Sequence, residues 1–137
     1  MVKYKVVRGK DIPKEARALS RGNDGLMESW YDKHRDDLFA TLLLRKGKLI
    51  GWCAVKKTYI LGFETRNFEI GTFVQPYYRG KGYGKRLLDR TLSFLKVVQP
   101  NAKILYGAPS DHGYFNEVYS KTISSKQLQP DKYYICD

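Results

Sequence analysis

One short run of the chain carries residue types that could bind a phosphate group. Gly80, Gly82 and Gly84 alternate with other residues between Arg79 and Lys85. Glycine has no side chain, so it lets the backbone adopt a positive φ and approach a ligand closely. A strand is expected just before this run and an amphipathic helix just after it, and the first turn of a helix presents unpaired N–H groups and the positive end of its dipole. The sequence therefore predicts a phosphate-binding loop.

Two well-known phosphate motifs do not fit this loop. A P-loop requires G-x-x-x-x-G-K-[ST], whereas Gly84-Lys85 is followed here by Arg86 and the glycine spacing differs. A dinucleotide fingerprint requires G-x-G-x-x-G with an acidic residue on a strand about 20 residues later. The spacing Gly80-x-Gly82-x-Gly84 is different, and no such acid follows. Both of these nucleotide-binding classes are therefore excluded.

The loop instead matches the pattern R-x-x-G-x-G, read as Arg79-Gly80-Lys81-Gly82-Tyr83-Gly84. This resembles the acetyl-CoA pyrophosphate loop of the GNAT superfamily of N-acetyltransferases. The strand Glu69–Val74, the lead-in Val74-x-Pro76-x-x-Arg79 and the pair Leu87-Leu88 also resemble that family's central motif. The resemblance implies an enzyme that transfers an acetyl group from acetyl-CoA to a primary amine, by direct attack in a ternary complex and without a metal.

The same resemblance implies which residues bind acetyl-CoA. Backbone N–H groups of the loop would hold the pyrophosphate, and the preceding strand would pair with pantetheine as an added strand would. In the family this strand carries a bulge and splays from the next one, and a backbone N–H near Phe73 or Val74 would polarise the thioester carbonyl. Alternatively, the Lys81 side chain lies on the open surface and does not contact the pyrophosphate. The implied residues are Thr72, Phe73, Val74, Arg79, Gly80, Lys81, Gly82, Tyr83, Gly84, Lys85 and Asn116.

Attack by an amine requires that the amine be neutral. A lysine-like ammonium has a pKa of about 10.4, so a base must accept its proton at neutral pH. We expect Glu69 to be this base, because a carboxylate in the middle of a central strand is costly to bury without a function or a partner. The alternative is a structural glutamate paired with a nearby lysine or arginine, since family members also use other residues or a water chain.

The CoA thiolate that leaves must gain a proton, and we expect Tyr119 to donate it. The family pattern N-x-x-A-x-x-x-Y-x-K-x-G-F is kept here in Tyr119-x-Lys121. Thr122-Ile123 stands in place of Gly-Phe, and Asn116 is too close to Tyr119, so the register stays open. Tyr114 is the second candidate for the acid, and core packing is the alternative for both tyrosines.

Other residues could take part near the acceptor. His112 follows the expected fifth strand and is an alternative base, although a loop histidine is more often simply solvated. Four aromatic residues could line the acceptor site, with core packing the stronger interpretation for the first of them: Trp30, Tyr31, Tyr77 and Tyr78.

The two cysteines, Cys53 and Cys136, lack the spacing of metal ligands. We expect both to be reduced thiols and expect no metal. Covalent catalysis by Cys53 is not expected, because its strand should lie away from the thioester.

The elements that position these residues follow from hydrophobic periodicity and turn signals. They predict a single domain over residues 1–137, of class α/β with a mixed sheet, in the order β-α-α-β-β-β-α-β-α-β-β. The expected helices are Lys14–Arg21, Leu26–Asp37, Lys85–Val97 and His112–Ser120. The expected strands are Tyr4–Val7, Phe39–Leu44, Leu49–Val55, Phe68–Val74, Ala102–Ala108, Ser124–Leu128 and Lys132–Cys136.

Composition adds one unusual property, which is charge. The 137 residues are 42% hydrophobic, enough for one core, and 25 Lys plus Arg against 14 Asp plus Glu give a net charge of +11. Such a charge attracts anions, whether nucleic acid, an acidic protein or a polyphosphate cofactor. With neither a signal peptide nor a membrane-spanning run evident, we expect a cytoplasmic monomer or homodimer.

The charge leaves two other hypotheses open. The domain could be a degenerate GNAT fold that serves as a basic binding module for nucleic acid or an acidic protein, without catalysis. Alternatively, the amine acceptor could itself be carried on a polyanion. No residue pattern identifies the acceptor, because acceptor-binding loops are where proteins of one fold diverge.

Overall fold

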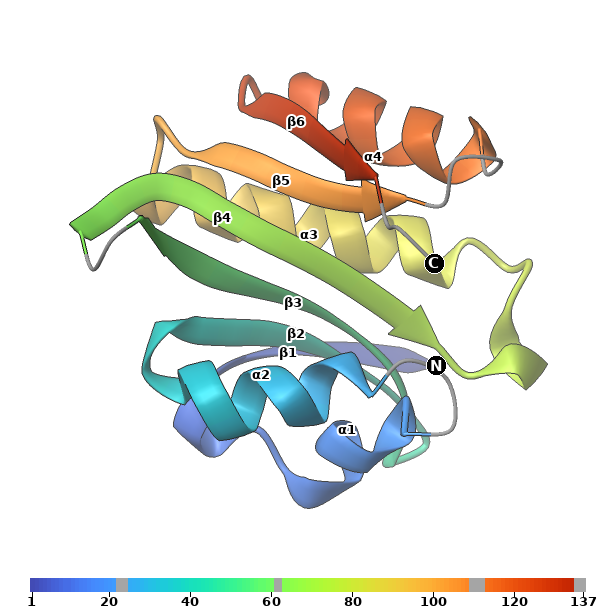
Figure 1. The fold of residues 1–137 in the computed structure, drawn as a ribbon. Helices are drawn as coiled ribbons and strands as arrows, with labels where there is room; N and C mark the ends of the chain where they lie inside the picture. Colours follow the sequence, from blue (N-terminus) through green and yellow to red (C-terminus); the bar gives the residue numbers. More distant parts are fainter. Residues whose placement is uncertain (22–24, 61–62, 109–112, 135–137) are drawn as a thin grey trace.

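The computed structural model describes residues 1–21, 25–60, 63–108 and 113–134, which form one six-stranded mixed sheet with helices on both faces (Figure 1). The strands lie in sequence order, so each strand pairs with its neighbours along the chain. The first four are antiparallel, and the last two join in parallel through helical crossovers. The strands are β1 (Val2–Arg8), β2 (Leu38–Arg45), β3 (Lys48–Ile60), β4 (Phe63–Val74), β5 (Lys103–Ala108) and β6 (Gln129–Tyr134).

Two pairs of helices cover the two faces of the sheet. Helices α1 (Lys14–Leu19) and α2 (Leu26–His34) pack on one face, while α3 (Tyr83–Val98) and α4 (Gly113–Ser125) pack on the other (Figure 1). Short 3₁₀ turns lie at Gly9–Asp11, Arg35–Asp37 and Pro76–Tyr78. None of the described helices is both long and apolar enough to cross a membrane. The α/β fold class with a mixed sheet is thus confirmed.

Strand β4 separates the two cores. Phe68, Ile70 and Val74 belong to the cluster under α3, whereas Phe73 belongs to the cluster under α2. This alternation follows from the period of two residues in a strand, and it confirms the predicted two-faced central strand. The helix that follows, α3, buries Leu87, Leu88, Thr91, Leu92 and Leu95 on one side, as its periodicity predicts.

The prediction of a strand at Ser124–Leu128 was wrong. Helix α4 continues to Ser125 and ends in a Schellman motif, in which the Leu128 N–H donates to the Ile123 carbonyl and the Gln127 N–H donates to the Ser124 carbonyl. Gln127 has a φ of 59°, the left-handed conformation that this motif requires. Ile123 and Leu128 are both buried, at the two positions where this motif commonly brings apolar side chains together. The strand expected at Lys132–Cys136 corresponds to β6, and Cys136 lies outside the described residues.

Strands β4 and β5 pair over only a short length. Their parallel register runs from Asn67 opposite Lys103 to Ile70 opposite Tyr106, and β4 continues to Val74 beyond this last pair. The splay that the resemblance implies is therefore present. The implied bulge is not found at Thr72–Val74, because β4 keeps one register with β3 from Phe68 to Val74. Its register shift lies earlier, where β3 passes from Lys57 to Tyr59.

Candidate functional site

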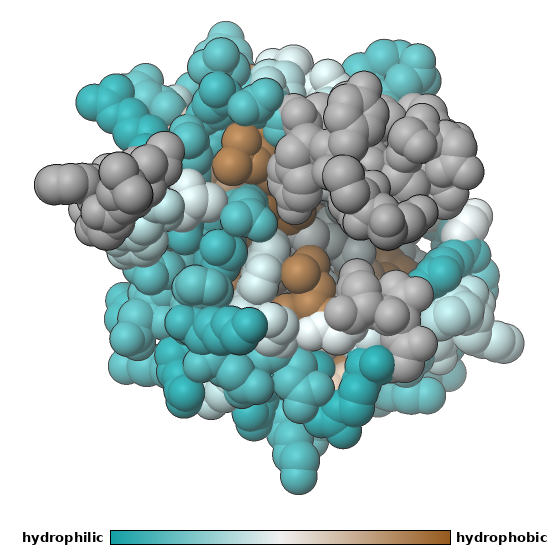
Figure 2. Space-filling model, viewed as in Figure 1, coloured by the Kyte–Doolittle hydropathy of each residue, from teal (hydrophilic) through white to brown (hydrophobic). Residues whose placement is uncertain are grey.

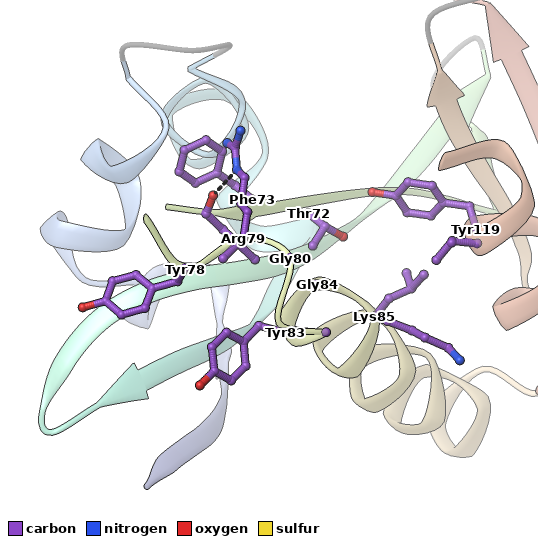
Figure 3. A pocket seen from close by; sticks show the side chains of 13 residues that line it. Thr72, Phe73, Tyr78, Arg79, Gly80, Tyr83, Gly84, Lys85 and Tyr119 are labelled. Carbon is purple, nitrogen blue, oxygen red and sulfur yellow. Dashed lines mark hydrogen bonds between the residues drawn. The ribbon is translucent and has the colours of Figure 1, made fainter. Parts of the chain in front are cut away.

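A cavity of about 480 Å³ opens where β4 leaves β5, between the glycine loop, the start of α3 and α4 (Figure 3). Hydrophobic residues come to the surface near the middle of the face shown in Figure 2, and hydrophilic residues surround them. The cavity unites residues from segments far apart in the sequence. They are Thr72, Phe73, Val74, Tyr78, Arg79, Gly80, Gly82, Tyr83, Gly84, Lys85, Leu88, Val118 and Tyr119.

Two of the loop glycines are required by backbone conformation. Gly80 has a φ of +79° and Gly82 a φ of +83°, and a Cβ at either position would meet no atom within 4 Å. Glycine is therefore required at these two positions by the left-handed φ, which other residues adopt at a cost of about 1–2 kcal/mol. At Gly84 a Cβ would only touch the Val74 side chain, at 3.9 Å. The loop is shaped by its backbone, which leaves the cavity side open for a ligand.

The N-terminus of α3 offers hydrogen-bond donors to this cavity. Gly82 is the N-cap and makes no side-chain cap, and the first backbone bond runs from the Arg86 N–H to the Gly82 carbonyl at 3.2 Å. The preceding N–H groups have no partner within the helix. The first turn of α3 holds no acidic residue, while Lys85 lines the cavity. A donor-rich helix end beside a cation can bind an anion.

The side chain of Arg79 holds the loop against the strand. Its Nε donates to the Val74 carbonyl at 2.7 Å, and its guanidinium lies 5.3 Å from the centre of the Phe73 ring (Figure 3). Lys81 is not among the lining residues. Its ammonium lies over the Tyr77 and Tyr78 rings, at 5.6 and 5.9 Å, which corresponds to the surface alternative for this lysine.

Tyr119 faces the strand wall from the opposite side of the cavity. It lies on α4, and its ring stacks on Tyr106 of β5 with centroids 5.6 Å apart and planes 17° apart. In Figure 3 its hydroxyl is directed toward the side on which Thr72 lies. Sequence reasoning did not identify Tyr106. This residue lies in the last β4–β5 pair, and its ring supports the ring of Tyr119.

Glu69 does not line the cavity. It faces the α2 side of the sheet, where its carboxylate lies 3.3 Å from the Lys56 ammonium. The side chain of Lys56 is 10% exposed and that of Glu69 is 28% exposed, and the ammonium also lies 5.9 Å from the centre of the Trp30 ring. Glu69 therefore has the basic partner that the structural alternative expects. Lys56 was missed because the sequence gives the strands but not the register that puts these two residues opposite each other.

Cys53 lies directly behind the cavity wall. Its strand, β3, supplies none of the described lining residues, as expected of a strand away from the gap between β4 and β5. The Thr72 hydroxyl donates to its sulfur at 3.4 Å, and Thr72 lines the cavity. Burial raises the pKa of the Cys53 thiol to about 11, and hydrogen bonds to Thr72 and Thr91 offset part of this rise. A thiol that stays protonated at neutral pH is a poor nucleophile, which is a second physical argument against a nucleophilic role for Cys53.

The remaining candidates divide into packed, exposed and undescribed residues. Trp30 is 7% exposed and belongs to the core under α2, as its packing interpretation predicts. The guanidinium groups of Arg17 and Arg35 lie 4.1 and 4.9 Å from the centre of the Tyr31 ring. The side chains of Tyr114 and Asn116, and His112 as a whole, lie outside the described residues. Among the described residues no group of three His, Cys, Asp or Glu could hold a metal ion.

Comparison with known families gives one clear match. The model for the family described as Acetyltransferase (GNAT) family matches residues 10–106, from before α1 to within β5. This range contains the glycine loop and all of β4. No curated protein sequence matches the chain.

Solved structures with the same fold are numerous. The IAA acetyltransferase from Bacillus cereus ATCC 14579 has a TM-score of 0.65 at 20% identity, over 88% of this chain and 75% of that one. The ribosomal-protein-alanine N-acetyltransferase from Brucella melitensis biovar Abortus 2308 has a TM-score of 0.60 at 18% identity, over 88% and 89%. The aminoglycoside N-acetyltransferase AAC(6')-Iy in complex with CoA has a TM-score of 0.61 at 15% identity, over 88% and 89%.

Proposed function

The chain belongs to the Acetyltransferase (GNAT) family, and from this we propose that it transfers an acetyl group from acetyl-CoA to a primary amine. The observation that carries the proposal is the single cavity in which the glycine loop, the splayed end of β4 and Tyr119 meet. A structural neighbour in complex with CoA supports the choice of donor.

The residues of the cavity fit the parts of acetyl-CoA. Gly80, Gly82 and the free N–H groups at the start of α3 suit the pyrophosphate, and Lys85 adds a positive charge beside them. The side chains of Leu88 and Val118 supply apolar walls suited to the pantetheine arm. Beyond Ile70, β4 is free of its pairing with β5, so its backbone suits hydrogen bonding to the arm and to the thioester carbonyl.

The chemistry requires two proton transfers. A neutral amine forms a C–N bond to the acetyl carbonyl, the C–S bond breaks, and the sulfur leaves as a thiolate. We assign Tyr119 as the acid that protonates this thiolate, since its hydroxyl is on the cavity side. We assign Glu69 as the base for the amine proton, acting from the α2 side of β4, with Lys56 holding its carboxylate in place.

We assign the acceptor only to the class of primary amines. The three structural neighbours carry names that give different acceptors, and at 15–20% identity they share the fold alone with this chain. We therefore propose the donor, the reaction and the chemical class of the acceptor, and we name no individual acceptor.

Binding of acetyl-CoA is the first test. Calorimetric titration of the wild-type protein should give one site with a micromolar dissociation constant. A protein that is folded by circular dichroism and releases no heat with acetyl-CoA would overturn the proposal. The rival hypothesis of a non-catalytic basic module would then gain support.

A tyrosine-to-phenylalanine exchange separates binding from turnover. Tyr119→Phe keeps the ring that stacks on Tyr106 and removes only the hydroxyl. With any amine that turns over, we expect kcat to fall about 100-fold while the KM for acetyl-CoA is kept. The release of CoA thiol measures both. An unchanged kcat would remove Tyr119 from the mechanism.

The pH dependence of the rate tests Glu69. In Glu69→Gln we expect kcat to be about 100-fold lower at neutral pH. Its rate should then rise with pH toward the pKa of the free amine, about 10.4 for a lysine-like acceptor, because the amine loses its proton unaided. A Glu15→Gln variant, which removes an exposed carboxylate from α1, serves as control and should keep the wild-type profile. A profile for Glu69→Gln parallel to that of the wild type would contradict the assignment.

A further inference from the structure

Outside the cavity, three arginines lie over tyrosine rings on one side of the molecule. The guanidinium of Arg90 is 4.2 Å from the centre of the Tyr4 ring, that of Arg86 is 5.9 Å from Tyr83, and that of Arg45 is 5.9 Å from Tyr78. These six residues are called the arginine–tyrosine surface below. The proposed transfer reaction uses none of the three guanidinium groups.

The six residues form one continuous surface. The rings of Tyr4, Tyr78 and Tyr83 all pack against the same core cluster under α3. Arg86 and Arg90 are one turn apart on that helix. Arg45 pairs with Val2 at the end of β1 and β2, two residues from Tyr4. In Figure 3, Tyr78 and Tyr83 point to the same side, away from Thr72 and Tyr119.

The charges on this surface are uncompensated. Within the part of the chain that the structure describes, Arg45, Arg86 and Arg90 form no ion pair, although other cations do, such as Lys126 with Asp89 at 2.8 Å. Among the described residues their recorded side-chain contact is the tyrosine ring beneath each guanidinium, a contact that leaves the N–H edges available to a ligand. In a protein of net charge +11, three fixed cations on one side form a site for a polyanion.

An exposed aromatic ring adjoins this surface. Tyr77 is 79% exposed, and its ring meets that of Tyr78 edge-on with centroids 5.0 Å apart. An exposed aromatic ring beside guanidinium groups provides a place for an unpaired base to stack, and the Lys81 ammonium, 5.6 Å from the centre of the Tyr77 ring, adds a further positive charge there. The carboxylates of an acidic protein would satisfy the charge but would use neither the ring nor the outer plane of the guanidinium groups.

From these observations we propose that the arginine–tyrosine surface binds single-stranded nucleic acid, through its phosphates and without sequence preference. Arginine forks match phosphate oxygens in pairs, and Tyr77 accepts a base. The proposal does not depend on acetyl transfer. Because Tyr78 and Tyr83 also line the cavity, the bound strand would run past its mouth.

Fluorescence anisotropy with a labelled oligouridine of about 12 nucleotides tests the proposal. About three phosphate contacts predict a slope near −2 for log K against log salt, so affinity should fall about 20-fold between roughly 50 and 200 mM salt. Saturating acetyl-CoA should leave this binding in place. Loss of the oligonucleotide on addition of acetyl-CoA would overturn the proposal, since the phosphates would then occupy the cofactor cavity.

A matched pair of triple variants separates the surface from net charge. Arg45→Gln, Arg86→Gln and Arg90→Gln together should weaken binding about 20-fold and flatten the salt slope. The control, Arg8→Gln, Arg35→Gln and Arg66→Gln, removes the same charge from exposed arginines toward the opposite end of the sheet and should change binding less than about 2-fold. Equal losses in the two variants would overturn the proposal in favour of diffuse charge.

Two further measurements separate planar contacts from charge, and nucleic acid from an acidic protein. Arg45→Lys, Arg86→Lys and Arg90→Lys together keep the charge, so weaker binding than wild type supports planar guanidinium contacts, whereas unchanged binding contradicts them. Polyglutamate of similar charge should displace the oligouridine poorly. Displacement as effective as that by unlabelled oligouridine would overturn the nucleic-acid assignment and favour an acidic protein.

Discussion

Two helices of this protein begin in the same way and differ in what faces their first turn. Both α2 and α3 follow a glycine N-cap in the left-handed conformation, Gly25 with a φ of 61° and Gly82 with a φ of 83°. Three residues after its cap, α2 carries Glu28, which Arg21 holds through two hydrogen bonds of 2.9 Å. At the equivalent position α3 carries Lys85, with no acid in its first turn. The difference agrees with the proposed site, in which the ligand supplies the negative charge at the N-terminus of α3.

Placing a glutamate at each glycine cap should produce the largest difference between the two helices in acetyl-CoA affinity. Gly82→Glu puts a carboxylate beside the proposed pyrophosphate site, and we expect acetyl-CoA to bind at least about 100-fold more weakly because like charges repel. Gly25→Glu introduces the same side chain at a cap with the same φ sign and equally open space. Gly25→Glu should lose about 1–2 kcal/mol of stability, as Gly82→Glu does, but it should bind acetyl-CoA as tightly as the wild type. Calorimetry and thermal melting measure the two quantities, and equal loss of binding in both variants would contradict a site at α3.

Reversing the charge at Lys85 should have a smaller effect on acetyl-CoA binding, and it makes the first turn of α3 resemble that of α2. Lys85→Glu should weaken acetyl-CoA binding about 10-fold, because an exposed cation near the phosphates is replaced by an anion. In the absence of ligand the same change should raise the melting temperature slightly, since an acid suits a helix N-terminus. Lys85→Gln should lie between the two for both quantities. Binding that is insensitive to this series would show that Lys85 points away from the ligand.

Removing the carboxylate of α2 should have the smallest effect, and on stability alone. The hydrogen bond from Arg21 lowers the pKa of Glu28, so its contribution is present above the ordinary pKa of 4.5 and is lost as the pH falls through the lowered value. Glu28→Gln should therefore lower the melting temperature by at most about 2 °C at neutral pH, and the difference should vanish in acid.

The control for this change is Glu15→Gln, an exposed acid in the first turn of α1 that forms no ion pair among the described residues. At neutral pH its melting temperature should fall less than that of Glu28→Gln, because it loses only the favourable interaction of a carboxylate with a helix N-terminus. Acetyl-CoA affinity should be unchanged in both variants. A difference between Glu28→Gln and the wild type that persists in acid would mean that packing, and not charge, is responsible.

The features that the sequence predicted are those encoded locally. The strand before the loop, the glycines with positive φ and the apolar stripe of α3 depend on neighbouring residues, and all three are present. Contacts set by strand register were not predictable in this way. The Lys56–Glu69 pair and the position of Cys53 behind Thr72 follow from how β3 pairs with β4, and this register shifts between Lys57 and Tyr59.

The error near the end of α4 has a different origin. The segment Ser124–Leu128 carries only one apolar residue, Leu128, which packs with Ile123 in the core at the end of a helix. Only the left-handed conformation of Gln127, which glutamine rarely adopts, distinguishes the two outcomes. The roles of Glu69 and Tyr119 remain predictions, although the structure places Tyr119 in the cavity.

The hydrogen bond from Arg79 to the Val74 carbonyl has a consequence for the thermodynamics of ligand capture. It closes residues 74–79 into a ring of six residues, so this first part of the loop loses its conformational freedom when the chain folds and not when the ligand arrives. Rigidity before binding favours affinity through entropy rather than through added contacts. A loop without this tie would keep the same donors but would bind with a more unfavourable entropy, and its fluctuations would slow the formation of a productive complex.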